Sequence, residues 1–144
     1  MAVDPYKSGM LKKSPYVGKR DVKGSVVAIL DFSSESRGLQ LISQPSRAVV
    51  QGQVHEMIIT DDTGAGPDQT VNRVSYLAFV SIEDSGVLLR NDTVYLNDEK
   101  IGVLAGFDET HMPNHQNVLV QSDQRYTGKE KGIQIGDVFR FVME

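Results

Sequence analysis

Short runs of β-branched and aromatic residues, each closed by Gly, Asn or Asp, recur from residue 22 onward, and no stretch keeps apolar residues at helical spacing. Such runs fit pleated strands, and the residues between them favour tight turns. The pattern therefore predicts an all-β fold, an antiparallel sandwich or barrel of about nine strands with little helix. No repeat of fixed period appears, so propellers and solenoids are not expected.

The turns between these runs predict where strands begin and end. The clearest is Asn97-Asp98, because both residue types tolerate the positive φ angles that a two-residue hairpin requires. We therefore expect a hairpin there, and weaker turns at Asp84-Ser85-Gly86 and Gly136-Asp137. The segments with the strand pattern are 22–32, 39–43, 48–60, 73–83, 87–90, 93–96, 100–107, 117–122 and 134–142.

Several of the predicted strands are apolar on both faces. A strand with one face in water alternates more cleanly between apolar and polar residues. The second face must therefore be buried, either inside a closed sandwich or against another subunit. We favour a sandwich or barrel with a subunit interface and predict a homo-oligomer. In segment 73–83 one face carries Val74, Tyr76, Ala78, Val80 and Ile82, and the other carries Leu77 and Phe79.

Length and charge limit the remaining possibilities. The chain has 144 residues, a formal net charge of −4 and no cysteine. A chain of this length builds one core, and we expect a flexible basic arm over residues 1–20 before a single β domain over residues 21–144. The negative charge argues against nucleic-acid partners, and no apolar run is long enough for a membrane helix. The first residues lack the apolar stretch of a secretory signal, so we expect a cytoplasmic protein.

The densest polar cluster is the segment GFDETHMPNHQN, from Gly106 to Asn117, between two predicted strands. Loops held on a rigid frame often carry binding residues. Imidazole and carboxylate groups are ligands that zinc, manganese and iron accept. The residues that predict a site for a divalent metal ion are Asp108, His111, His115 and, from an earlier strand, His55.

The same loop offers other roles. Glu109 could act as a general base beside the metal, and Asn114 and Asn117 would complete a binding loop for a small molecule. Alternatively, Asp108 and the two asparagines fold the loop through hydrogen bonds between side chains and backbone. Pro113 lies between the two histidines and argues against a helix that would place both rings on one face. The sequence leaves these alternatives open.

The segment GFDETHMPNHQN, the hairpin from Leu96 to Val103 and the closing Gly136-Asp137-Val138-Phe139 together resemble a small bacterial family of uncharacterised all-β proteins. The resemblance covers most of the chain after Val22 and implies a β-sandwich. It implies no activity, cofactor or catalytic residue.

Two functions follow from these observations. The preferred one is a homo-oligomeric binding or assembly module, because the strands are apolar on both faces and no catalytic constellation is complete. The alternative is a metal-assisted enzyme that acts on a small metabolite through residues 108–117.

Overall fold

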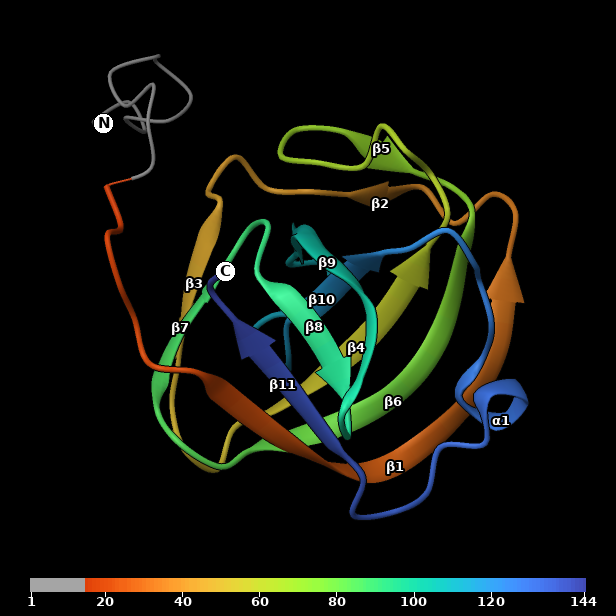
Figure 1. Ribbon diagram of the computed structural model, residues 1–144. Coiled ribbons are helices and arrows are strands. Elements are labelled where there is room, and N and C mark those ends of the chain that lie inside the picture. The colour runs from red at the N-terminus through yellow and green to blue at the C-terminus, as the bar shows by residue number, and fades with distance from the viewer. Residues whose placement is uncertain (1–14) are drawn as a thin grey trace.

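The computed structural model describes residues 15–144 (Figure 1). Residues 1–14 of the predicted arm lie outside the described residues. The main sheet is a closed barrel in the strand order β1-β11-β8-β9-β10-β4-β6, and two small sheets, β2-β5 and β3-β7, lie beside it. The prediction of an all-β fold is confirmed, as a barrel. The elements are β1 (Val22–Ser34), β2 (Leu39–Gln40), β3 (Ser46–Val49), β4 (Val54–Thr60), β5 (Thr70–Val71), β6 (Val74–Ile82), β7 (Gly86–Leu89), β8 (Thr93–Leu96), β9 (Glu99–Asp108), β10 (Asn117–Gln121), α1 (Gly128–Lys131) and β11 (Val138–Val142).

The predicted hairpin joins β8 to β9. Asn97 has a φ of 54°, and Leu96 pairs with Glu99 across the turn. Neighbouring strands around the barrel are antiparallel except β4 and β10, which are parallel with Met57 opposite Val118. The sheet is therefore mixed, which corrects the purely antiparallel expectation. Parallel neighbours need a long connection, and here that connection contains β5 to β9.

Segment 48–60, predicted as one strand, forms two. β3 ends at Val49 and β4 begins at Val54, because the chain turns at Gly52, whose φ is 90°. Residues with a side chain rarely adopt this conformation. The turn separates the partners of the two strands, since β3 pairs with β7 while β4 lies between β10 and β6 in the barrel.

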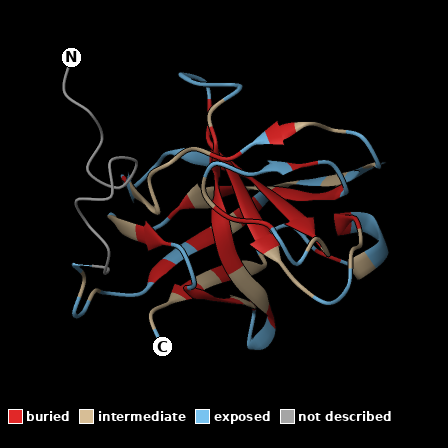
Figure 2. Ribbon diagram, turned by 90° about the horizontal axis from the view of Figure 1, so that it is seen from above, coloured by how far each residue is buried: buried red, intermediate tan, exposed pale blue. Residues whose placement is uncertain are grey.

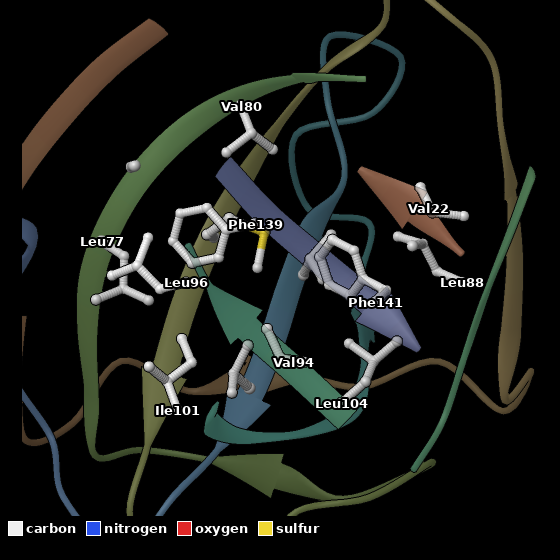
Figure 3. Packing of buried hydrophobic residues seen from close by; sticks show 14 of the residues in the cluster. Val22, Leu77, Val80, Leu88, Val94, Leu96, Ile101, Leu104, Phe139 and Phe141 are labelled. Atoms are coloured by element: carbon white, nitrogen blue, oxygen red, sulfur yellow. The ribbon is translucent and has the colours of Figure 1, made fainter. Parts of the chain in front are cut away.

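One apolar cluster fills the barrel interior. Phe139 and Phe141 of β11 point inward beside Val94 and Leu104 (Figure 3), and all four side chains are fully buried. Figure 2 shows that buried residues are concentrated on the barrel strands and exposed residues on their connections. Burial of this cluster is the main source of stability for the barrel.

A second apolar cluster lies on the opposite face of β4 and β10. Met57 and Val118 belong to the interior cluster, whereas the next residues along, Ile58 and Leu119, belong to the second. Successive side chains of a strand point to opposite faces, so this cluster is outside the barrel, where Leu39 of β2 packs against it. The chain itself thus buries both faces of β4 and β10. The subunit interface stays a prediction.

The only helix in residues 15–144 is α1. It begins with a capping box in which Thr127 and Glu130 exchange hydrogen bonds between side chain and backbone. Its first residue, Gly128, lies so close to β6 that a Cβ there would be 1.9 Å from the carbonyl oxygen of Leu77. No helix in this part of the chain is long and apolar enough to cross a membrane.

Candidate functional site

A row of four side chains crosses the outer face of the barrel where β10 begins. Glu56 of β4 pairs with Phe79 of β6 on one side and with Asn117 of β10 on the other, and Asn117 pairs with Asp108 of β9. The residue after Glu56, Met57, belongs to the interior cluster, so alternation along the strand places the row outside. The row leads into loop 109–116, which connects β9 to β10.

Asp108 organises this loop. Its Oδ2 accepts a hydrogen bond from the backbone N–H of Gln40 (2.9 Å), and its Oδ1 accepts from the backbone N–H of Thr110 (2.8 Å) and from Nδ2 of Asn117 (3.1 Å). Burial alone would raise the pKa of the Asp108 carboxyl, but these hydrogen bonds outweigh burial and lower the pKa. Both oxygens of this predicted metal ligand therefore already have protein partners, and they hold the loop in place.

His55 fastens β4 to the end of the same loop. Its Nδ1 accepts a hydrogen bond from the backbone N–H of Gln116 (3.0 Å), and its Nε2 lies 3.2 Å from Oε1 of Gln53. Burial lowers the pKa of His55, and the nearby His115 and Arg47 lower it further. A neutral ring with both nitrogens engaged fits a packed, structural histidine.

The structure brings His111 and His115 together. Their ring centroids are 5.1 Å apart, with 35° between the ring planes. His111 is exposed, whereas His115 is buried with its ring nearly perpendicular to that of Phe79 (83°), 5.0 Å between centroids. Nδ1 of His115 lies 3.0 Å from Nδ2 of Asn114, so this asparagine of the predicted binding loop fixes the imidazole.

Glu109, the predicted general base, already has partners. Its Oε2 accepts a hydrogen bond from Nε2 of Gln116 (3.0 Å) and lies 3.1 Å from the guanidinium of Arg47. Residues 15–144 contain no group of three or more His, Asp or Glu side chains placed to hold a metal ion. His55, Asp108, His111 and His115 are thus neighbours of one loop without forming a common ligand shell.

Glu56 is the residue of this site that the sequence analysis missed. Its carboxylate is buried, and its Oε1 lies 3.9 Å from Nε2 of His115, beyond hydrogen-bond distance. Burial raises the pKa of Glu56, which Arg37 opposes only in part. A signal was available in the sequence, because Glu56 stands alone as a charged residue among the apolar positions of its strand.

Three buried polar atoms around Glu56 have no hydrogen-bond partner within the described chain. They are Nε2 of His115, Oδ1 of Asn117 and Oε1 of Gln116. Leaving such atoms unsatisfied costs about 1–3 kcal/mol each, and native proteins leave few of them. Burial and the neighbouring His111 lower the pKa of His115, while a side-chain hydrogen-bond contact with Asn117, outside ordinary hydrogen-bond geometry, opposes the shift. The site therefore combines a neutral imidazole, a desolvated carboxyl and the amide of Asn117.

A separate groove of about 530 Å³ lies between β9 and the loop that follows β4. Asp61, Lys100 and Asp123 line it, together with the hydroxyls of Thr63 and Ser122. None of these side chains is among the buried polar atoms without a partner in residues 15–144. Within the described residues, the groove therefore presents no buried polar atom that lacks a hydrogen-bond partner.

Comparison with known proteins gives one match. A family model described as a family of unknown function (DUF6917) matches residues 16–142, in agreement with the resemblance to an uncharacterised family. No curated protein and no solved structure matches the chain. The site therefore has to be interpreted from its own geometry.

Proposed function

The chain belongs to the DUF6917 family, for which no function is known, and we propose that it is a non-catalytic module that binds a small polar molecule. The binding site is the outer face of the barrel at Glu56, His115 and Asn117. One observation carries the proposal, namely that the carboxylate of Glu56 is buried on this face while its Oε1 lies 3.9 Å from Nε2 of His115, beyond hydrogen-bond distance.

A ligand is the most economical partner for this carboxylate. A barrel can satisfy a buried polar group internally, as it does for Asp108 and His55, and binding sites are where such groups stay open. The side chains of Glu56 and His115 are each 10% exposed, so the site reaches the surface. The rigid strands that hold Glu56 and Asn117 keep these groups in position before a ligand arrives.

A titration of the ¹⁵N-labelled protein tests this proposal. The probes are myo-inositol, acetate and methylammonium, which are neutral, anionic and cationic, and the readout is the backbone amide spectrum. We expect at least one probe to shift the amides of residues 56 and 115–117, with a weaker response in Glu56→Gln. The matched control, Asp84→Asn in an exposed turn, should respond like the wild type. The proposal is overturned if no probe shifts these amides or if the shifts lie elsewhere.

An acid–base enzyme is the second candidate, favoured by the pair Glu56 and His115. Burial raises the pKa of Glu56 and lowers the pKa of His115. The two pKa values therefore lie closer together than in free side chains, as they do in pairs that transfer a proton. Activated ester and phosphoester substrates test this candidate. Turnover that disappears in both Glu56→Gln and His115→Asn would support it, and turnover that persists in both would count against it.

Two expectations from the sequence stay as separate predictions. A divalent metal at the loop would require Asp108 or Glu109 to give up hydrogen bonds or an ion pair, and elemental analysis of the purified protein, with His111→Ala/His115→Ala as comparison, decides it. The homo-oligomer is checked by analytical ultracentrifugation at low micromolar concentration, where a monomer would contradict it.

A further inference from the structure

The groove of about 530 Å³ between β9 and the loop that follows β4 has the size of a small-molecule site. Such sites occupy roughly 300–1,000 Å³. None of Glu56, His115 and Asn117 lines the groove. The groove is therefore separate from the candidate site, and what it binds does not depend on the proposed function.

The walls of the groove are held in place by close packing and hydrogen bonds. On the β9 side, a Cβ at Gly102 would lie 2.2 Å from the carbonyl oxygen of Gln121, so the two strands touch there. On the other side, Nε2 of Gln121 donates to the carbonyl oxygen of Asp62 (3.1 Å), and the backbone N–H of Ser122 donates to that of Thr60 (2.9 Å). The groove is therefore formed before a ligand arrives, which lowers the cost of binding.

Three charged side chains line the groove, and one of them is already paired. Oδ2 of Asp61 lies 2.9 Å from the guanidinium of Arg73, and its Oδ1 lies 3.9 Å from Nε of Arg125. The charge of Asp61 is thus offset by its own neighbours. The charges that face the groove without such neighbours are those of Lys100 and Asp123.

Lys100 and Asp123 are exposed, and they line the same groove. In residues 15–144 neither side chain has an ion pair or a hydrogen bond, either with the other or with any third group. Two opposite charges that face one groove without meeting leave room between them. A molecule that carries both signs of charge can pair with each of them at once.

We infer that the groove binds a zwitterionic α-amino acid, with its carboxylate on Lys100 and its ammonium group on Asp123. An anion without a positive group is disfavoured, because it would meet the carboxylate of Asp123. A cation without a negative group is disfavoured, because it would meet the ammonium group of Lys100. A neutral molecule would leave both charges without an ion pair.

The rest of the lining fits the same class. The hydroxyls of Thr63 and Ser122 also face the groove, and a hydroxyl can donate to a carboxylate or accept from an ammonium group. The partly exposed Val103 adds an apolar surface, on which the side chain of the amino acid can pack. The groove therefore offers a partner to each part of an α-amino acid.

The test titrates the full-length ¹⁵N-labelled protein at constant ionic strength with three probes. They are L-alanine, N-acetyl-L-alanine, which lacks the ammonium group, and L-alaninamide, which lacks the carboxylate. We expect L-alanine to shift the backbone amides of residues 61–63, 100–103 and 121–123. Each analogue should bind roughly two- to fivefold more weakly, because it lacks one ion pair that stays open to water.

Two variants assign the charges. Lys100→Gln should bind L-alaninamide as well as it binds L-alanine, since the partner of the carboxylate is gone. Asp123→Asn should bind N-acetyl-L-alanine as well as it binds L-alanine, for the corresponding reason. Lys23→Gln and Asp84→Asn remove the same charges at other exposed positions and should respond like the wild type.

Each outcome decides the inference. Shifts of the groove amides with L-alanine that both charge variants weaken support it. Equal affinity of the wild type for L-alanine and both analogues overturns the zwitterion class. No shift of the groove amides with L-alanine, or shifts only at residues 56 and 115–117, overturns the site itself. The proposed function at Glu56 stands or falls separately, because the two sites share no residue.

Discussion

His55 and Gln116, 61 residues apart in the sequence, are joined by a hydrogen bond from the backbone N–H of Gln116 to the imidazole Nδ1 at 3.0 Å. The bond can exist only while Nδ1 carries no proton. It ties the end of loop 109–116 to β4, next to Glu56 and His115. The geometry of the candidate site therefore depends on a neutral His55.

The first prediction concerns acid stability. The pKa of His55 is lowered in the folded protein by burial and by His115 and Arg47, so the unfolded chain binds a proton at a higher pH than the folded one. Stability should therefore fall as pH drops below the ordinary value of 6.5 toward the folded pKa. In His55→Asn, whose Oδ1 can accept from Gln116, that slope should be smaller. Urea unfolding between pH 5 and 8 measures it, and equal slopes in both proteins would contradict the prediction.

The second prediction concerns Glu56. Burial raises its pKa, so the folded protein holds a proton that the unfolded chain has already lost above the ordinary value of 4.5. Stability should decrease as pH rises through this window and stay reduced above it. Glu56→Gln removes the desolvated charge and should raise the free energy of unfolding at pH 7 while weakening ligand binding. The exposed Glu83→Gln should change stability by less than about 0.5 kcal/mol. A destabilised Glu56→Gln would show that Glu56 has a structural role.

The third prediction concerns Asp108, whose carboxylate accepts three N–H groups. Asp108→Asn replaces one acceptor oxygen by a donor that faces those groups, and should cost about 1–3 kcal/mol. Because the pKa of Asp108 is lowered, its contribution is present above the ordinary value of 3.8 and is lost as pH falls through the folded pKa. Chemical denaturation at pH 7 checks the cost, with Asp84→Asn as control. If both variants match the wild type, Asp108 does not organise the loop.

The local turn chemistry was readable from the sequence, whereas breaks inside apolar runs were not. The pair Asn97-Asp98 predicted the β8–β9 hairpin, because few residue types adopt the φ angles of its turn. The turn at Gly52 was not predicted, because Val49, Val50 and Val54 continue the strand pattern on both sides of Gln51-Gly52-Gln53. Its effect becomes visible only when β3 and β4 are seen to have different partners.

Only the loop of the candidate site could be predicted from the sequence, for a related reason. The polar loop that contains His115 stands out in the sequence, but the partner of that histidine, Glu56, lies 59 positions earlier and is brought close by the parallel pairing of β4 with β10. Sequence spacing cannot reveal such a register. The structure also assigns each carboxylate its neighbours, which separates Asp108, with three N–H donors, from Glu56, whose Oε1 lies 3.9 Å from Nε2 of His115.

The fourth prediction uses a close approach between two strands of the barrel. Gly102 of β9 faces β10, and a Cβ at this position would lie 2.2 Å from the carbonyl oxygen of Gln121. Gly102→Ala must displace backbone, which should cost about 1–3 kcal/mol or more. The control is Gly18→Ala, where nothing lies within 4 Å of the added Cβ, so its stability should be unchanged or slightly raised. Thermal unfolding measures the melting temperatures of the two variants. Similar values would contradict the close packing of β9 on β10 at Gly102.

The fifth prediction concerns a buried ion pair between Lys19 and Asp92. Nζ of Lys19 lies 3.0 Å from Oδ2 of Asp92, and the two side chains are only 6% and 1% exposed. Burial raises the pKa of Asp92, although a backbone hydrogen bond from Leu89 and the nearby Lys19 oppose the shift. Lys19→Met would leave an unpaired buried carboxylate, which should cost roughly 3–5 kcal/mol at pH 7.

A double-mutant cycle separates the pair from its surroundings. Asp92→Asn keeps an oxygen that can accept from the backbone N–H of Leu89, as Oδ2 of Asp92 does at 3.0 Å. Adding it to Lys19→Met should therefore recover part of the lost stability, because no charge stays buried. Lys19→Met alone should also be less damaging at low pH, where Asp92 can take up a proton. A Lys19→Met variant within about 0.5 kcal/mol of the wild type would mean that residues 15–20 do not hold Lys19 against the barrel in solution.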